Sequence, residues 1–445
     1  MTTHTNQPYF TITGGTPLHG SVRVGGAKNA SYKLMIAALL GDSESRLLNF
    51  SHISDVALVR DIINYLGGHA YEAGERAIFI DPTNLTSPRI KPEHGAQGRF
   101  STMFIPALLH RFGRAEVPQP GGDKIGKRDL DRHFDGLKAL GAEIRVENGI
   151  YIATTNGLKG ATYRFKKNTH TGTETLIMAA VKAKGRTILE NAAEEPEIDD
   201  LITFLNSMGA WIRRRPNRVI EIEGVDHLQG AIHRVMPDRN EVVTYACTAI
   251  STKGDIVVEN ARPEHLSAFL ATFDQINAGY EMGNYGIRFF YKGPLQATTI
   301  TTQIEPGFMT DWQPLIATVL TQCHGNSIIH ETIMANRFQY VEALKQMGAD
   351  IEFFNPEVTN PEEIYNFNTD EDKPEYFHAI KITGPSQLHA GEFQVVDLRH
   401  GATLVSAALA AQGTSKLFNI EQIDRGYEKL HERLSSMGAN IVRNA

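Results

Sequence analysis

Apolar stretches of helical length recur along the chain, and a glycine follows each of them. Ser31 to Leu40, Glu174 to Ala183 and Ala402 to Ala411 are clear examples, and such stretches are often rich in alanine. A glycine directly after the stretch suits the left-handed backbone conformation that closes a helix. The pattern therefore predicts six buried helices, which end near Gly41, Gly113, Gly185, Gly254, Gly325 and Gly413.

The segments between these helices repeat as well. A short run of strand-like composition comes first, and it often ends in asparagine, as at Asn49, Asn191, Asn260 and Asn419. An amphipathic segment follows, ends at a second glycine, and gives way to alternating residues such as Glu143 to Val146. Each repeat is therefore predicted to run helix, strand, helix, strand.

The first four intervals between the glycines are 69 to 72 residues long, and the fifth is 88. The polar stretch from Asn355 to Pro374 accounts for the excess, and we expect it to be a surface insertion. Repeats of this size are too large for a solenoid and too small for typical separate domains. In a chain of 445 residues, two globular halves of three repeats each are the economical arrangement. A repeat scaffold built only for binding stays open.

The composition is that of an ordinary globular protein, with 41% hydrophobic and 21% charged residues. A formal charge of −7 argues against a broad nucleic-acid surface. Cys247 and Cys323 cannot form a disulfide framework, and the histidines show no HExxH metal-binding pattern. Residues 1–10 lack the apolar core of a secretion signal, and no apolar run approaches the roughly 20 residues that span a bilayer. We therefore expect a cytoplasmic protein with neither a metal nor a membrane partner.

Charged residues gather where the apolar helices begin, at Lys28, Arg239, Asp311 and Arg399. Backbone N–H groups at a helix N-terminus carry partial positive charge, so a lysine beside them favours an anion such as phosphate or carboxylate. An Asp or Thr at such a place can act simply as a helix cap. An arginine there is disfavoured unless something anionic offsets it. Arg239 and Arg399 therefore point to a ligand or to an ion pair.

A glycine-rich loop with three cations and one carboxylate extends from Gly121 to Arg128. Its sequence fits the first seven positions of a phosphate-binding P-loop, but Arg128 replaces the Ser or Thr that holds magnesium, which argues against nucleotide hydrolysis. Glycines permit motion and the cations attract negative charge, so we favour a mobile lid over an anionic substrate. A solvated surface loop is the alternative.

Several ordered motifs can be read together: GGAKNA at 25–30, PGG at 120–122, EPEI at 195–198, PDR at 237–239, NRF at 336–338, DLR at 397–399 and IDRGYE at 423–428. Over nearly the whole chain they resemble the UDP-N-acetylglucosamine 1-carboxyvinyltransferase family of enolpyruvyl transferases. The resemblance implies an α/β fold without a cofactor: a two-domain inside-out α/β barrel, each domain built from three βαβαββ-type repeats, with the active site in the cleft between them. One domain would cover residues 28–236, and the other would combine residues 1–27 with 237–445.

That family transfers the enolpyruvyl group of phosphoenolpyruvate to the 3′-hydroxyl of UDP-N-acetylglucosamine, by addition and then elimination of phosphate, at the start of peptidoglycan precursor synthesis. A compact, highly charged substrate needs fixed cations around it. By resemblance the catalytic residues are Asp123, Asp311, Lys28 and Arg399, of which Asp311 takes the proton of the sugar hydroxyl. The implied binding residues are Lys28, Arg128 and Arg425 for the phosphate, Arg337 and Arg399 for the carboxylate, and Asn29, Arg99, Asp131, His170, Thr171 and Ile333 for the nucleotide sugar.

Asp123 departs from the family pattern, because most members carry a loop cysteine there. By resemblance, that cysteine delivers a proton to C3 of phosphoenolpyruvate and is captured by the antibiotic fosfomycin. A carboxylic acid can donate a proton but is a poor nucleophile toward an epoxide, so we predict an active, fosfomycin-resistant enzyme. The neighbouring cations favour the ionised form of Asp123, a preference that loop closure against a phosphate would offset.

The segment from Asn168 to Thr173 is a second departure, because the family's uridine-contacting segment commonly has a Ser-Val-Gly core and only the glycine is kept. Nucleotide binding is supported, and the identity of the base stays open. Transfer to another hydroxyl acceptor, shikimate 3-phosphate or a nucleoside, also stays open, as does a non-catalytic anion-binding repeat protein. The GAKN and IDRGY motifs favour the UDP-sugar. Lys28, Asp311, Arg399 and Arg425 together argue against the non-catalytic alternative, since a pure scaffold has no need of unpaired cations.

Overall fold

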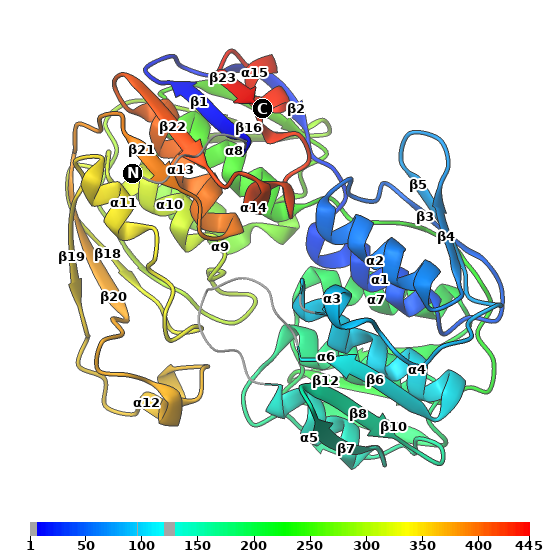
Figure 1. Ribbon diagram of the computed structural model, residues 1–445. Coiled ribbons are helices and arrows are strands. Elements are labelled where there is room, and N and C mark those ends of the chain that lie inside the picture. Colours follow the sequence, from blue (N-terminus) through cyan, green and yellow to red (C-terminus); the bar gives the residue numbers. More distant parts are fainter. Residues whose placement is uncertain (1–6, 96, 120–129) are drawn as a thin grey trace. The chain divides into compact units, whose positions relative to one another are not determined.

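The computed structural model describes residues 7–95, 97–119 and 130–445, apart from the side chain of Glu371 (Figure 1). Within these residues the chain forms two compact units. The N-terminal unit comprises residues 25–119 and 130–236, and the C-terminal unit comprises residues 7–24 and 237–445. The polypeptide therefore leaves the C-terminal unit after Val24 and returns to it at Pro237.

The described part of the N-terminal unit contains three sheets, with strand orders β13-β3-β5-β4, β6-β8-β7 and β11-β12-β10-β9. Its strands are β3 (Ser45–Leu48), β4 (His69–Glu72), β5 (Ala77–Asp81), β6 (Arg114–Pro118), β7 (Glu143–Glu147), β8 (Ile150–Thr154), β9 (Thr162–Arg164), β10 (Arg186–Glu190), β11 (Trp211–Arg215), β12 (Val219–Glu223) and β13 (Ile232–Arg234). Its helices are α1 (Lys28–Ala38), α2 (Ser54–Tyr65), α3 (Pro92–Gly95), the 3₁₀-helix η1 (Arg99–Phe104), α4 (Ile105–Phe112), α5 (Asp131–Ala139), α6 (His170–Ala180) and α7 (Pro196–Ser207).

The described part of the C-terminal unit also contains three sheets, with strand orders β15-β16-β14-β2, β17-β18-β20-β19 and β21-β22-β1-β23. Its strands are β1 (Tyr9–Thr13), β2 (His19–Arg23), β14 (Asp255–Glu259), β15 (Gly279–Gly283), β16 (Gly286–Phe290), β17 (Thr299–Thr301), β18 (Gly325–His330), β19 (Asp350–Phe354), β20 (Ala379–Gly384), β21 (Glu392–Gln394), β22 (Thr414–Phe418) and β23 (Asn440–Asn444). Its helices are α8 (Arg239–Ser251), η2 (Pro263–His265), α9 (Ser267–Gln275), α10 (Gln313–Leu320), α11 (Val341–Gln346), α12 (Pro361–Ile364), η3 (Thr369–Glu371), α13 (Leu398–Ala410), α14 (Glu421–Asp424) and α15 (Leu430–Ser436).

One βαβαββ order runs through these sheets. In the repeat β9-α6-β10-α7-β11-β12, the strands before and after the buried helix pair in parallel, and the later strands pair antiparallel. The first repeat of each unit takes its opening strand from elsewhere in the chain. Strand β13 pairs in parallel with β3, and β2 pairs in parallel with β14. Each unit thus begins its first repeat with a strand that is not directly before that repeat's helix in sequence, which explains the unit boundaries after Val24 and Met236. The predicted α/β repeat fold is confirmed.

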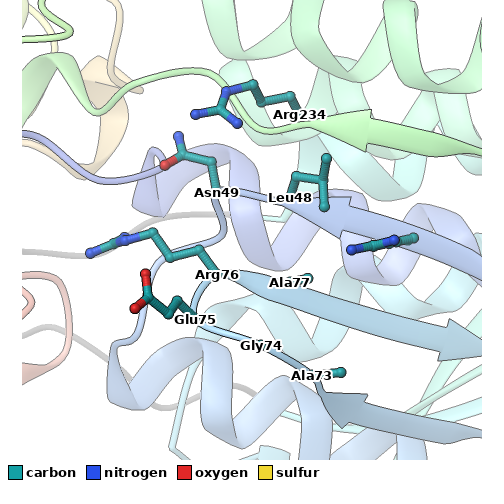
Figure 2. A pocket seen from close by; sticks show the side chains of 9 residues that line it. Leu48, Asn49, Ala73, Gly74, Glu75, Arg76, Ala77 and Arg234 are labelled. Atoms are coloured by element: carbon teal, nitrogen blue, oxygen red, sulfur yellow. The ribbon is translucent and has the colours of Figure 1, made fainter.

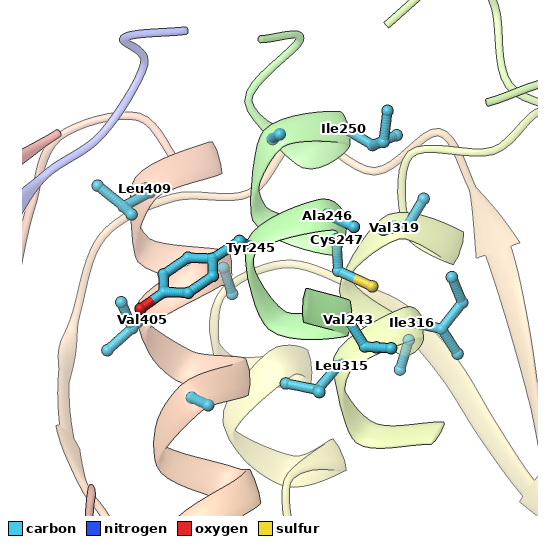
Figure 3. Close-up of a cluster of buried hydrophobic side chains, with 14 of the residues drawn as sticks. Val243, Tyr245, Ala246, Cys247, Ile250, Leu315, Ile316, Val319, Val405 and Leu409 are labelled. Atoms are coloured by element: carbon cyan, nitrogen blue, oxygen red, sulfur yellow. The ribbon is translucent and has the colours of Figure 1, made fainter. Parts of the chain in front are cut away.

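Three buried helices form the centre of the C-terminal unit. Helices α8, α10 and α13 contact one another through small and branched side chains, which permit close approach. Figure 3 shows Ala246 and Cys247 of α8, Leu315 and Val319 of α10, and Leu409 of α13 within this cluster. Burial raises the pKa of the Cys247 thiol, so it behaves as a small apolar core residue.

The buried helices begin earlier than the apolar stretches that predicted them. Helix α1 begins at Lys28 instead of Ser31, α6 at His170 instead of Glu174, and α13 at Leu398 instead of Ala402. The first turn of each helix is polar, so the apolar periodicity starts only in the second turn. As a result, Lys28, Arg239 and Arg399 lie inside the first turns of their helices, whereas Asp311 lies just before α10, which begins at Gln313.

The predicted left-handed glycines are present at four of the six positions. Gly113, Gly185, Gly325 and Gly413 have φ between 66° and 107°, whereas Gly41 and Gly254 do not have positive φ. At the end of α8, Lys253 takes the left-handed conformation with φ 56°. Gly254 is required there for space, since a Cβ atom would lie 2.4 Å from the Leu18 carbonyl oxygen.

The asparagines that end the strand-like runs share a left-handed conformation. Asn49, Asn191, Asn260 and Asn419 have φ between 54° and 65°. Three of these side chains donate to the backbone carbonyl that directly follows the parallel neighbouring strand: Asn49 to Val235, Asn191 to Phe165 and Asn419 to Val395. Asn tolerates this conformation and also supplies a side-chain donor. In three repeats it therefore ties the end of one strand to the end of the parallel strand beside it.

The insertion expected at Asn355 to Pro374 lies between β19 and β20 and carries the short helices α12 and η3. Much of it is exposed, but Tyr365 and Phe367 are buried. It is therefore more than a solvated surface loop.

A buried ion pair joins α1 to α6. Lys33 Nζ lies 2.6 Å from Glu174 Oε2, and the two side chains are 2% and 0% exposed. Removing one partner of such a pair leaves an uncompensated charge in the interior, which costs about 3–5 kcal/mol.

We expect Lys33→Met to lower the free energy of unfolding by about 3 kcal/mol, since it leaves the Glu174 carboxylate buried. The double variant Lys33→Met, Glu174→Leu removes both charges and should recover most of the loss. Lys345, paired with Glu342 at 3.6 Å on the exposed face of α11, is the matched control, and Lys345→Met should cost little. Urea denaturation measures all three, and an equal effect of Lys33→Met and Lys345→Met would refute the role of this pair.

Candidate functional site

Asp311 lies between two buried guanidinium groups in the C-terminal unit. Its Oδ1 accepts a hydrogen bond from Arg337 Nη2 at 3.2 Å, and its Oδ2 accepts from Arg399 Nε at 3.2 Å and Nη2 at 3.1 Å. The Arg337 and Arg399 side chains are 2% and 4% exposed, whereas the Asp311 side chain is 22% exposed. The carboxylate is therefore the accessible part of the cluster, and it holds both cations in place.

The ends of two helices position this cluster. Arg399 is the second residue of α13, and the Asp397 side chain caps that helix by accepting from the Arg399 backbone N–H at 2.8 Å. Gln313, the first residue of α10, donates to the Arg337 carbonyl at 3.4 Å, and the Tyr340 hydroxyl donates to Gln313 at 2.6 Å. Because α10 and α13 contact each other, Asp311 just before α10 meets Arg399 at the start of α13.

A directed hydrogen-bond chain anchors Arg399 to α8. Its Nη1 donates to the Tyr427 hydroxyl at 2.9 Å, and burial raises the pKa of Tyr427, so the phenol stays neutral. The Tyr427 oxygen lies 2.7 Å from Thr244 Oγ1, and the Thr244 hydroxyl donates to the Asn240 carbonyl at 2.8 Å. Since that bond uses the one Thr244 proton, Tyr427 is the donor to Thr244. The Asn240 carbonyl thus orients the Thr244 hydroxyl, which orients the Tyr427 hydroxyl, which in turn orients the Arg399 guanidinium group.

The other predicted residues of this unit lie on neighbouring segments. Arg239, the first residue of α8, pairs with Glu305 at 2.7 Å and is almost wholly buried. Arg425 directly follows α14, two residues before Tyr427, and its Nη1 lies 3.5 Å from Gln422 Oε1. The backbone N–H of Ile333 donates to the buried Glu331 carboxylate at 2.8 Å.

In the N-terminal unit, Lys28 is the first residue of α1, and Asn29 is the second. Lys28 Nζ lies 3.0 Å from Asp55 Oδ2, and the two side chains are 11% and 5% exposed. The same ammonium group lies 5.5 Å from the centre of the Tyr32 ring. The Tyr32 ring also contacts Phe100, the second residue of η1, so α1 is joined to the element that begins with Arg99.

The first turns of α5 and α6 are joined in the same unit. His133 Nε2 lies 2.9 Å from Thr171 Oγ1, and Arg132 donates to the Asn168 carbonyl at 2.9 Å. Burial, with Arg99 and Arg132 nearby, lowers the pKa of His133 to about 3, so this imidazole is neutral at physiological pH. Asp131 begins α5 and directly precedes Arg132 and His133.

His170, the first residue of α6, belongs to a cluster of buried charges. Its Nε2 lies 3.1 Å from Lys33 Nζ and 3.3 Å from Glu174 Oε1, and its Nδ1 lies 3.9 Å from Glu195 Oε1. Burial and Lys33 act to lower the pKa of His170, but Glu174 and Glu195 outweigh them and raise it. The cluster therefore ties the first turn of α6 to α1 and to the start of α7.

Four of the predicted cations have carboxylate partners: Lys28, Arg239, Arg337 and Arg399. The sequence pointed to a ligand or an ion pair for Arg239 and Arg399. The structure shows ion pairs, between Arg239 and Glu305 and between Arg399 and Asp311. Lys28 is likewise paired, so the expectation of unpaired cations is wrong for these residues. Paired cations at helix ends can still meet a ligand, because a substrate anion can replace the carboxylate.

Asp123 and Arg128 lie outside the described residues, so their roles stay predictions. A cavity of about 230 Å³ in the N-terminal unit is lined by none of the predicted site residues that the structure describes (Figure 2). It is lined by Arg46, Asn49, Glu75, Arg76 and Arg234, among others.

In residues 7–95, 97–119 and 130–445, no helix is long and apolar enough to cross a bilayer.

Several site residues were not apparent from the sequence pattern: Asp55, Glu305, Glu331 and Tyr427. Asp55 opens α2, and an acidic residue at a helix start is a recognisable signal. Tyr427 lies within the IDRGYE motif, in which the resemblance implies a binding role only for Arg425. Nothing in the local sequence marks Glu305 or Glu331, because Glu305 pairs with the distant Arg239 and the contact of Glu331 with Thr310 spans 21 residues.

The chain was compared with known proteins. Residues 12–434 match the EPSP synthase (3-phosphoshikimate 1-carboxyvinyltransferase) family. A protein of Halothermothrix orenii named UDP-N-acetylglucosamine 1-carboxyvinyltransferase is 39% identical over 432 residues, which are 97% of this chain and 98% of that protein. UDP-N-acetylglucosamine 1-carboxyvinyltransferase 3 of Caldanaerobacter subterraneus is 39% identical over 98% of this chain and 99% of its own length.

A solved structure supports the fold. The enolpyruvyl transferase NikO from Streptomyces tendae superposes with a TM-score of 0.85 at 22% identity, covering 98% of this chain and 99% of that one. The match to residues 12–434 and the full-length relatives lead to one conclusion. The chain belongs to the EPSP synthase family of carboxyvinyltransferases, and its curated relatives within that family are UDP-N-acetylglucosamine 1-carboxyvinyltransferases.

Proposed function

We propose that this protein transfers the enolpyruvyl group of phosphoenolpyruvate to the 3′-hydroxyl of UDP-N-acetylglucosamine and releases phosphate. The observation that carries the proposal is the accessible Asp311 carboxylate between two buried guanidinium groups. A base beside fixed cations suits a reaction between a hydroxyl group and a small polyanion. The names of the full-length relatives support UDP-N-acetylglucosamine as the acceptor.

The reaction is an addition followed by an elimination. The acceptor oxygen bonds to C2 of phosphoenolpyruvate, its proton leaves to a base, and a second proton is delivered to C3. The C2–O bond to phosphate then breaks while a proton leaves C3, which restores the double bond. In this proposal Asp311 takes the hydroxyl proton, and Asp123 exchanges the proton at C3.

The cations of each unit bind the anionic groups. Arg337 and Arg399 receive the phosphoenolpyruvate carboxylate, and their planar donor arrays suit that group. Lys28, Arg128 and Arg425 bind the phosphate. Because Arg337 and Arg399 already sit in fixed positions through Asp311, little reorganisation is needed when an anion arrives.

The remaining predicted residues bind the nucleotide sugar. They lie in the first turns of helices or in segments tied to them, where backbone donors are available. The contact between His133 and Thr171 supports one such surface, since it fixes the α6 turn. The residues proposed for this role are Asn29, Arg99, Asp131, His170, Thr171 and Ile333.

The full chain, mixed with phosphoenolpyruvate and UDP-N-acetylglucosamine, should release phosphate and form the enolpyruvyl ether. Parallel reactions with shikimate 3-phosphate or a nucleoside should release none above background. Colorimetric phosphate and mass spectrometry of the product measure the outcome. Release only with another acceptor would replace the proposed substrate, and no release with any acceptor would support the non-catalytic alternative.

Asp311→Asn should lower kcat by about 10²–10⁴-fold, because the amide cannot take the hydroxyl proton. Asn keeps the size of the side chain and one oxygen acceptor for the arginines. Asp350→Asn, an exposed change on β19, serves as the control and should leave kcat unchanged. Steady-state kinetics decide the point, and near-normal kcat for Asp311→Asn would exclude it as the base.

The unmodified protein should keep its activity after incubation with fosfomycin, because a carboxylate reacts poorly with the epoxide. Asp123→Cys should become sensitive, with a time-dependent loss of activity and a covalent mass increase. Asp123→Asn should lose most of its activity if Asp123 exchanges the proton at C3. Rapid inactivation of the unmodified protein, or full activity of Asp123→Asn, would contradict the respective role.

A further inference from the structure

The insertion between β19 and β20 is not needed to complete its repeat. The equivalent hairpins β7–β8 and β15–β16 turn through residues 148–149 and 284–285 only. The β19–β20 hairpin has the same antiparallel pairing, which ends at Phe354 and Ala379, but it turns through residues 355–378. Since the same sheet geometry forms without such an extension, the extension serves something beyond the fold.

A small aromatic core holds the insertion together. The Tyr365 ring lies 4.8 Å from Phe367 and 4.9 Å from His378, measured between ring centres. His378 Nε2 lies 2.8 Å from Asp372 Oδ2, and the His378 backbone N–H donates to Asn355 Oδ1 at 2.8 Å. Tyr365, Phe367 and His378 are buried, so this segment has a defined shape.

The insertion contacts residues 330–332, which follow or end β18. The Glu331 backbone N–H donates to the His378 carbonyl at 2.7 Å, and the Asn366 backbone N–H donates to the Thr332 carbonyl at 2.7 Å. The Tyr365 hydroxyl lies 3.3 Å from His330 Nε2, at the end of β18. The insertion therefore fixes this segment through backbone as well as side-chain contacts.

Glu331 carries these contacts toward Asp311. Its side chain is fully buried, and its Oε1 accepts from the backbone N–H groups of Ile333 at 2.8 Å and Met334 at 3.0 Å. Its Oε2 accepts from the Thr310 hydroxyl at 2.9 Å. Thr310 directly precedes Asp311, so one buried carboxylate orders both the Ile333 turn and the residue next to the proposed base.

The two arginines are held differently. Arg399 is fixed by the α13 cap and by Tyr427, and the Arg337 backbone is fixed by Gln313 of α10. These contacts come from residues outside 355–378. Loosening the insertion should therefore disturb the Ile333 turn and leave the arginine pair in place.

We propose that residues 355–378 are a positioning element for acceptor binding, which acts through Glu331 on the Ile333 turn. The inference rests on the proposed function for the identity of the acceptor, UDP-N-acetylglucosamine. Glu331 is a positioning residue, because it acts through its neighbours. The arrangement assigns the insertion to the acceptor side of the reaction and not to the phosphoenolpyruvate side.

The test replaces residues 355–378 by Asn-Gly, the turn that the chain itself uses at Asn148 and Gly149, where φ is 50° and 75°. The KM for UDP-N-acetylglucosamine should rise about tenfold, while the KM for phosphoenolpyruvate and kcat change less than about twofold. Calorimetry should show the same loss of affinity for UDP-N-acetylglucosamine. Unchanged acceptor KM and affinity, or an equal rise in both KM values, would overturn the proposal.

A point variant guards against failure of the shortened chain to fold. Tyr365→Ala removes the centre of the aromatic core and should raise the acceptor KM several-fold. Ile364→Ala, a change of a 47% exposed neighbour on α12, is the matched control and should have no effect. Equal kinetics of the two variants would contradict the role of the insertion.

Hydrogen exchange separates this inference from the proposed function. In the shortened chain, the backbone N–H groups of Ile333 and Met334 should exchange faster than in the full chain, whether or not the protein uses UDP-N-acetylglucosamine. If the full chain releases no phosphate with that acceptor, the proposed function fails while the exchange still reports on positioning. Unaltered exchange at both residues would overturn the positioning role itself.

Discussion

A guanidinium group at the N-terminal end of a buried helix is unfavourable by itself, because it meets the positive end of the helix dipole and is removed from water. The C-terminal unit offsets this cost with carboxylates, Glu305 for Arg239 and Asp311 for Arg399. The pairs can exist only when α8, α10 and α13 bring these residues together. Asp311 is thus needed to organise the arginines before any chemistry takes place.

In the βαβαββ repeat, the residues that pack the buried helix and the polar residues of its first turn occupy different positions. The buried helices use small and branched side chains for contact with their neighbours, and the repeats share this requirement. Their first turns differ, with Lys28 in α1, His170 in α6, Arg239 in α8 and Arg399 in α13. Four repeats therefore present a lysine, a histidine or an arginine at an equivalent place, where a change of side chain need not alter the packed helices.

Local patterns predicted the helices, strands and repeat order well, because apolar periodicity reports burial directly. They placed the helix starts too late, since the first turns are polar and the apolar periodicity begins only in the second turn. The asparagines at the strand ends were visible in the sequence, but their left-handed conformation was not predicted, and neither was Lys253 in place of glycine at the end of α8. The carboxylate partners were not predictable: Glu331 is near Arg337 in sequence but acts on Thr310, and Glu305 is far from Arg239. Such pairings depend on which repeats adjoin, and no short pattern contains that information.

The ion pairs that order the arginines also join anion binding to the acceptor side of the proposed reaction. The Asp311 carboxylate accepts three hydrogen bonds from the guanidinium groups of Arg337 and Arg399. In the proposed reaction, the phosphoenolpyruvate carboxylate binds those same guanidinium groups and competes with Asp311 for their N–H donors. Each donor that turns to the substrate frees a lone pair of Asp311 for the acceptor hydroxyl. In that reaction, the anion and the hydroxyl group therefore meet at one carboxylate shared by two arginines.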